Sequence, residues 1–89
     1  LAKRYRVIVI SDEIHAPLTF KNQPFTPFLS LGADAAEVGV TVTAASKGWN
    51  IAGLKCALVI SQSESMHIKL NELPPAMHYR ASLWALLQL

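Results

Sequence analysis

The order of apolar and polar residues along the chain predicts a small sheet. Residues 5–11 are rich in β-branched side chains and almost continuously apolar, which is typical of a strand buried on both faces of a parallel sheet. Residues 39–43 are β-branched and alternate in polarity, so they predict a second strand. A third strand is expected at 54–61. Its short connection through Gly53 favours antiparallel pairing, because a parallel crossover needs about a dozen residues.

Helices are expected around and after these strands. Residues 1–4 resemble a helix end, where Lys3 and Arg4 would face the negative helix C-terminus. The breakers Pro17, Pro24 and Pro27 predict a loop. We expect this loop at 16–27, a short helix at 28–31, and longer helices at 63–73 and 77–89, interrupted at 74–75. The fold class predicted from this pattern is α/β, a mixed sheet with helical cover.

The composition is too apolar for an independent domain of this size. Hydrophobic residues make up 52% and charged residues 16% of the 89 residues, whereas an average globular chain is about 25% charged. A domain this short hides only about 60–65% of its unfolded surface and needs a polar exterior. The chain also opens at Leu1 without an initiator Met and stops in an apolar stretch, 82–89. We therefore expect residues 1–89 to be a piece of a larger domain.

Several classes of protein are disfavoured by the same sequence. No apolar run approaches the roughly 18 residues of a membrane span, and the basic start is followed by too few apolar residues for a signal peptide. The single cysteine, Cys56, excludes an internal disulfide and fits a reducing cytoplasm. A net charge of +2 does not favour a nucleic-acid partner. His67 and His78 lack metal-ligand spacing, so no metal site is expected.

Two polar clusters follow the first and second predicted strands. Residues 11–15 (SDEIH) contain Asp12, and residues 44–48 (AASKG) contain Lys47. The carboxyl ends of parallel strands share the sheet edge where α/β proteins bind ligands, so Asp12 and Lys47 could face a common ligand. A desolvated lysine is a nucleophilic amine that forms Schiff bases. The alternative, which these two residues alone favour, is a surface Lys–Asp pair worth about 0–1 kcal/mol.

The residues around both clusters resemble a known family. Residues 11–16 (SDEIHA) and 46–54 (SKGWNIAGL) resemble the fold-type I pyridoxal-phosphate (PLP) enzymes of the class I/II aminotransferase family, and within it the cystathionine β-lyase-like C–S lyases. The resemblance covers nearly the whole chain in the family's order of elements. It implies an aspartate aminotransferase-like fold in which residues 1–89 are the central part of the PLP-binding large domain. The N-terminal part and the C-terminal small domain would lie outside them, in a homodimeric parent.

The resemblance also implies residue roles. Lys47 corresponds to the lysine that forms the Schiff base with the cofactor and moves protons at the substrate Cα. Asp12 corresponds to the aspartate that pairs with the pyridine nitrogen, where a carboxylate keeps that nitrogen protonated and the ring able to accept electrons. His15 occupies the position of a residue that aligns the ring or Asp12, although a histidine that only supports the loop is an equal alternative.

Three positions depart from the family pattern. Ala44 stands where many relatives have a phosphate-binding Ser or Thr, which leaves Ser46 and Thr43 as candidate phosphate contacts. Lys55 stands in place of a phosphate-binding arginine and keeps the charge without the bidentate fork. Pro17 replaces a common acidic residue and affects loop shape only. These departures concern the affinity for phosphate rather than the roles of the lysine and the aspartate.

Other residues are expected to be structural. Glu13 is expected to be a salt-bridge or turn residue, and Asn50 to shape the turn after Lys47. Trp49 is expected to pack, with a place beside the cofactor or in a substrate channel as the alternative. Cys56 is expected to be an inert residue of a buried strand.

The leading functional prediction is a PLP-dependent β-eliminating C–S lyase acting on cystathionine, cysteine conjugates or related amino acids. An aminotransferase on the same scaffold is the alternative, because Lys47 and Asp12 serve both reactions. A non-enzymatic regulator that retains the fold is a third hypothesis. Because the family's remaining cofactor and substrate contacts lie outside this segment, we expect residues 1–89 alone to be inactive.

Overall fold

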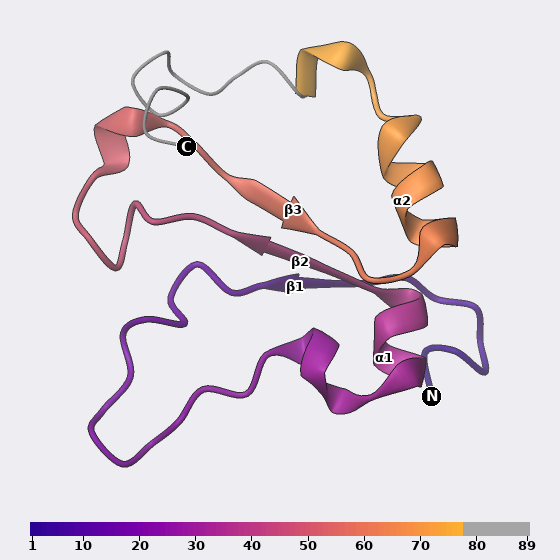
Figure 1. The fold of residues 1–89 in the computed structure, drawn as a ribbon, viewed down its shortest axis with the longest axis horizontal. Coiled ribbons are helices and arrows are strands. Elements are labelled where there is room, and N and C mark those ends of the chain that lie inside the picture. The colour runs from indigo at the N-terminus through magenta and orange to yellow at the C-terminus, as the bar shows by residue number, and fades with distance from the viewer. Residues whose placement is uncertain (78–89) are drawn as a thin grey trace.

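The computed structural model describes residues 1–77, which form a three-stranded sheet with short helices (Figure 1). The strands are β1 (Val9–Asp12), β2 (Gly39–Thr43) and β3 (Leu58–Ile60), in the order β1-β2-β3. β1 and β2 run parallel, and β3 is antiparallel to β2. The mixed sheet and the antiparallel third strand predicted from the sequence are therefore confirmed.

The first and third strands are shorter than predicted. The ladder between β1 and β2 begins at Val9 opposite Gly39, so residues 5–8 lie before it. The ladder between β2 and β3 joins Thr43 to Leu58 and Thr41 to Ile60. A 3-10 helix at Ala52–Leu54 occupies the start of the expected third strand. Strand length is thus limited by the short central strand, to which both neighbours must hydrogen-bond.

The helices agree in part with the sequence pattern. α2 (Glu64–Asn71) is confirmed, and Ser63 caps it by accepting a hydrogen bond from the Met66 N–H at 3.2 Å. A 3-10 helix forms at Phe28–Leu31, as expected. α1 (Ala33–Val38) was not predicted, because its six residues are too few to show a helical period. A 3-10 helix at Pro75–Met77 ends the described chain, and the rest of the helix expected at 77–89 lies outside the described residues.

The first residues form the expected helix-end turn. The Val7 N–H donates to the Ala2 carbonyl, the Arg6 N–H donates to the Lys3 carbonyl, and Arg6 has φ of 54°. This pair of bonds around a left-handed residue is the Schellman arrangement of helix C-termini. Lys3 then reaches α1, with Nζ 2.8 Å from a Glu37 carboxylate oxygen and 2.9 Å from one of Asp34. The hydrogen bond to Glu37, and then that to Asp34, raise the Lys3 pKa above its ordinary value.

The two helices and the two polar clusters lie at opposite ends of the sheet. In Figure 1, α1 leads into the start of β2 and α2 follows the end of β3, both at one end. The carboxyl ends of β1 and β2 point to the other end, where long loops and the Ala52–Leu54 turn lie. This end is the ligand-binding edge expected of an α/β sheet.

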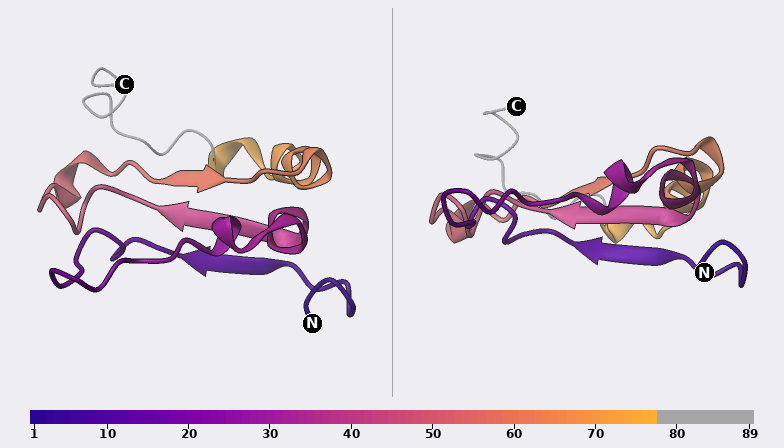
Figure 2. Two further views of the ribbon diagram at one scale, coloured as in Figure 1. Left: turned by 60° about the horizontal axis from the view of Figure 1, so that its bottom comes forward. Right: turned by 90° about the horizontal axis from the view of Figure 1, so that it is seen from below.

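The described chain is thin and leaves much of its sheet uncovered. Its principal extents are 40 × 40 × 17 Å, and Figure 2 (right) shows it edge-on. Leu29, Val40 and Met66 are the buried apolar side chains of the described part. Ile10 in β1 is 71% exposed, so residues 1–77 alone do not bury the first strand on both faces, and that expectation stays a prediction for the larger domain.

A close approach at the α1–β2 junction gives a stability prediction. A Cβ on Gly39 would lie 2.5 Å from the Ala35 carbonyl oxygen and 2.7–2.8 Å from ring and methyl carbons of Phe28 and Leu29. Gly39→Ala should therefore lower the free energy of unfolding by about 1–3 kcal/mol through overpacking. Urea denaturation of the substituted and unsubstituted proteins, monitored by circular dichroism, measures this change. Gly53→Ala, whose Cβ would meet nothing within 4 Å, is the matched control, and equal effects of the two substitutions would contradict the packing argument.

Candidate active site

The structure places the two polar clusters on neighbouring parallel strands. Asp12, the last residue of β1, lies beside Val42 of β2, and the Glu13 N–H continues the ladder by donating to the Val42 carbonyl at 2.8 Å. Lys47 follows the end of β2 at Thr43 after a few residues. The two strands therefore deliver Asp12 and Lys47 to the same edge of the sheet, as the sequence predicted.

The loops that follow these two strands are also in contact. A Cβ on Gly48 would lie 2.9 Å from the Cβ and 3.0 Å from the Cγ of Pro17, so the turn after Lys47 packs closely on the loop after His15. The Thr43 hydroxyl also donates to the Glu13 carbonyl at 3.4 Å. Pro17 was expected to affect only the shape of its loop, and the structure gives it this contact with the lysine turn.

The Asp12 carboxylate is exposed and carries one local hydrogen bond. Its Oδ1 accepts the Ile14 N–H at 3.2 Å. The exposed carboxylate therefore carries no cost of burial. Within residues 1–77, the ion pairs are those of Lys3, so Asp12 and Lys47 do not form the surface pair considered as the alternative.

Lys47 is exposed on a tight turn. The Trp49 N–H donates to the Ala45 carbonyl at 3.0 Å, and the Ile51 N–H donates to the Ser46 carbonyl at 3.1 Å. Asn50 has φ of 54°, a left-handed conformation that asparagine tolerates better than most residues. The expectation that Asn50 shapes this turn is confirmed.

The remaining candidate residues lie on the segments around these two strand ends. His15 is exposed, and its carbonyl accepts the Leu18 N–H at 2.9 Å. Ser46 is half-buried beside Lys47. Lys55 is exposed at the end of the Ala52–Leu54 turn, with φ of 47°. In the described chain these three side chains make no hydrogen bond or ion pair, and their roles stay predictions.

A cavity of about 430 Å³ lies beside the lysine turn. Its walls are mainly apolar and include Pro17, from the loop after the first cluster, and Ser46 and Trp49, from the lysine turn. Trp49 is 65% exposed, so in the described chain it lines this cavity rather than filling a core. Cys56 also lines it, half-buried and outside β3, and the expectation that it lies in a buried strand is wrong.

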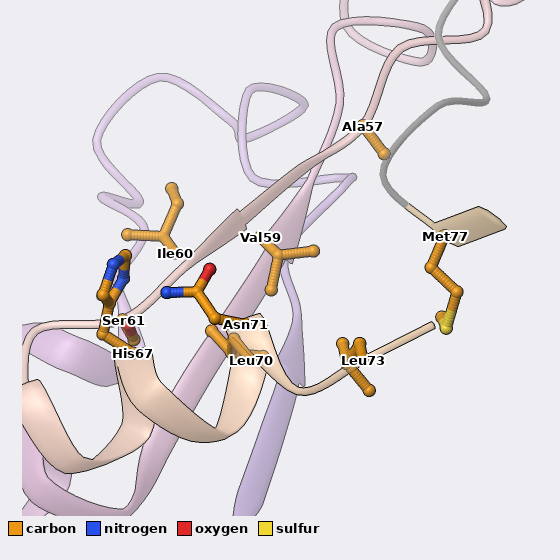
Figure 3. A pocket seen from close by; sticks show the side chains of 9 residues that line it. All are labelled: Ala57, Val59, Ile60, Ser61, His67, Leu70, Asn71, Leu73 and Met77. Carbon is orange, nitrogen blue, oxygen red and sulfur yellow. The ribbon is translucent and has the colours of Figure 1, made fainter. Parts of the chain in front are cut away.

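A second cavity, of about 490 Å³, lies between β3 and α2 (Figure 3). Val59, Leu70 and Leu73 give it apolar walls, and the His67 and Asn71 side chains lie near each other on α2. None of the candidate site residues lines this cavity. In residues 1–77 no three His, Cys, Asp or Glu side chains are grouped to hold a metal ion, and no described helix is long and apolar enough to span a membrane.

Glu13 makes more contacts than the salt bridge or turn expected from the sequence. It is 8% exposed, and one of its carboxylate oxygens accepts three hydrogen bonds. The alternation of side chains along a strand could have indicated this burial, because Glu13 follows Asp12 and must point to the opposite face of the sheet. Its partners could not be identified from that pattern, since they lie up to 28 positions away in the chain.

Comparison with known proteins shows what this chain is similar to. A sequence profile of the family described as "Aminotransferase class I and II" matches residues 1–87. A candidate cystathionine beta-lyase of Mycobacterium leprae (strain TN) is 49% identical over 65 residues, which cover 73% of this chain and 16% of the relative. The cystathionine beta-lyase of Corynebacterium glutamicum is 42% identical over 67 residues, covering 73% of this chain and 17% of the relative.

A solved structure agrees with these sequence matches. The crystal structure of a candidate PLP-dependent beta-cystathionase from Corynebacterium diphtheriae superposes with a TM-score of 0.82 and 44% identity. The match covers 91% of this chain and 21% of that structure. The chain thus spans about one sixth of the length of the curated relatives it matches.

Proposed function

The chain belongs to the family of class I and II aminotransferases, and from this premise we propose that it forms the central part of the PLP-binding large domain of a C–S β-lyase. Its fold, a mixed α/β sheet with helices, is the fold of the PLP-dependent structure that it matches. The observation that supports the proposal most directly is the pairing of β1 with β2. It puts an exposed carboxylate, Asp12, and an exposed amine, Lys47, at one sheet edge.

The residues at this edge fit pyridoxal phosphate chemically. A protonated pyridine nitrogen needs a carboxylate, and Asp12 has one that is exposed and outside any ion pair of the described chain. The aldehyde needs an amine, which Lys47 offers on a turn that holds its backbone in place. A phosphate needs donors and positive charge, for which we propose Ser46 and Lys55. Both are near the lysine in sequence, although Lys55 is a point charge rather than an arginine fork.

Each proposed residue has a distinct task. When bound, pyridoxal phosphate supplies an electron sink for a carbanion at the substrate Cα. Lys47 would hold the cofactor through its amine and would take the α-proton of the bound substrate. Asp12 would hold the ring nitrogen in its protonated form, and His15 would align the ring or Asp12. With a sulfur leaving group at Cβ, elimination and hydrolysis yield a thiol, pyruvate and ammonia.

An aminotransferase is the second candidate, because Lys47 and Asp12 would serve it equally. The family profile includes that activity by name, whereas the two curated relatives reported above are named as cystathionine β-lyases. In transamination Lys47 would again be the proton-transfer group, and the amino group would pass to a keto acid. The substrate contacts that separate the two reactions are proposed to lie outside these 89 residues.

The proposal is tested with the whole protein of which these residues would be a part. Given cystathionine and pyridoxal phosphate, it should release pyruvate and a free thiol in equal amounts, and it should not transfer amino groups to a keto acid. Residues 1–89 alone should release no pyruvate, because the resemblance places the phosphate-cradling turn and the carboxylate-binding arginine elsewhere. Amino transfer without pyruvate release would favour the aminotransferase, and binding of the cofactor without either reaction would favour a regulator. We further propose a cytoplasmic homodimer for the whole protein.

A further inference from the structure

Glu13 has a buried carboxylate that the proposed chemistry does not use. Its Oε1 accepts the Phe28 N–H at 2.8 Å, the Ser11 hydroxyl at 3.0 Å and the Thr41 hydroxyl at 3.4 Å. These donors belong to β1, β2 and the first turn of the Phe28–Leu31 helix. A buried charge needs such partners, since an unpaired carboxylate in this position would be expensive. The side chain therefore joins three segments at one point.

The backbone of Glu13 is held as firmly as its side chain. Its N–H donates to the Val42 carbonyl at 2.8 Å, and its carbonyl accepts the Ala16 N–H at 3.0 Å and the Thr43 hydroxyl at 3.4 Å. The residue thus closes the parallel ladder at the end where β1 stops and the loop begins.

Asp12 is the neighbour whose direction depends on these contacts. Successive side chains of a strand point to opposite faces, so holding Glu13 on the face of Ser11 and Thr41 directs Asp12 to the other face. The Ile14 N–H, on the far side of Glu13, donates to the Asp12 Oδ1 at 3.2 Å. Any rotation of the Glu13 peptide would change both the direction of the Asp12 carboxylate and this hydrogen bond.

We propose that Glu13 is a positioning residue that fixes the direction of the Asp12 carboxylate toward the cofactor ring nitrogen. The proposal rests on the cofactor role proposed above for Asp12. Glu13 itself is not a catalytic acid, because its carboxylate faces the opposite side of the sheet and is occupied by three donors. The Glu13 N–H also donates to the Val42 carbonyl of β2, the strand that leads to Lys47. The same residue therefore fixes the spacing between the ends of β1 and β2.

The first test needs no cofactor. Amide hydrogen exchange of the whole protein without added cofactor, resolved to single amides by mass spectrometry, compares Glu13→Gln with Glu72→Gln, the same change at an exposed carboxylate. In Glu13→Gln the Phe28 amide should exchange about tenfold faster, because a hydrogen bond to a charged acceptor is replaced by one to a neutral acceptor. The Ile14 amide, bonded to Asp12, should also exchange faster. Faster exchange at Phe28 with no change at Ile14 would overturn the proposal and leave Glu13 a purely structural residue.

A second variant allows the same test if Glu13→Gln does not fold. The double substitution Ser11→Ala, Thr41→Val keeps the carboxylate and removes two of its donors. The Ile14 amide should again lose protection, by less than in Glu13→Gln because the Phe28 N–H remains as a donor. Unchanged exchange at Ile14 would count against the proposal here too.

The cofactor test uses the whole protein and two ligands, pyridoxal phosphate and an analogue whose ring nitrogen is replaced by carbon. Glu13→Gln should weaken binding of pyridoxal phosphate about tenfold and leave binding of the analogue nearly unchanged, because Asp12 has no partner on the analogue. Equal losses for both ligands would overturn the positioning role. If the unsubstituted protein binds neither ligand, the proposed function fails, and the exchange of the Ile14 amide alone then decides the role of Glu13.

Discussion

Lys47→Ala in the whole protein should reduce the release of pyruvate from cystathionine by about 100- to 10,000-fold, the contribution expected of a positioned proton-transfer group alone. The loss should be larger still if covalent attachment of the cofactor is also needed. Lys47 is suited to both tasks because it is exposed, stands on a turn held by two backbone hydrogen bonds, and is outside the ion pairs of the described chain.

Two control variants separate chemistry from charge. Lys47→Arg keeps the positive charge but offers no amine that loses its proton near neutral pH, so it should be as inactive as Lys47→Ala. Lys69→Ala removes an exposed lysine of α2, at the opposite end of the sheet, and should keep full activity. Pyruvate is measured by a coupled dehydrogenase assay, and the bound cofactor by its visible absorbance. Activity retained in Lys47→Ala would refute the assignment of the lysine.

Asp12→Asn should lower the same activity by about 10- to 1,000-fold at neutral pH. A carboxylate beside a cation raises the pKa of that cation by about 1–3 units, so its removal lowers the pKa of the ring nitrogen and leaves a smaller protonated fraction. The substitution keeps the size of the side chain and an oxygen that can accept the Ile14 N–H. The fold should therefore be unaffected, and the loss should be electrostatic.

The activity lost in Asp12→Asn should depend on pH in a definite direction. Lower pH restores the protonated ring nitrogen, so the ratio of Asp12→Asn activity to unsubstituted activity should rise as pH falls below neutrality. Glu72→Gln, which removes an exposed carboxylate outside the site, should show no such change in ratio. A deficit of Asp12→Asn that stays constant from acid to neutral pH would contradict the pairing of Asp12 with the ring nitrogen.

The exposed sheet supports the proposal that these residues belong inside a larger domain. Ile10 of β1 and Val59 of β3 are more than half exposed, and the described chain is only 17 Å deep. Apolar strands with open faces and edges are association sites when nothing covers them. The matched 65–67 residues make up only 16–17% of the relatives, and we propose that polypeptide outside these residues covers the sheet in the whole protein.

Much of the fold could be inferred from the residues alone, because it depends on local patterns. The β-branched run of β2, the serine that caps α2 and the short link before β3 each act within a few residues. The resemblance of the two polar blocks to a family depends on residue identity and spacing, and the matched profile confirms it. The strand lengths were overestimated at β1 and β3, because a strand extends only as far as its partner allows.

Contacts between distant segments required the tertiary structure. The Glu13 carboxylate meets the Phe28 N–H 15 positions later and the Thr41 hydroxyl 28 positions later, and Gly48 approaches Pro17. Such contacts follow from the register between strands and from the path of the loops, which no local periodicity specifies. The two residues proposed as reactive could therefore be selected from the chain alone, whereas the hydrogen bonds around Glu13, beside one of them, became visible only when the strands were paired.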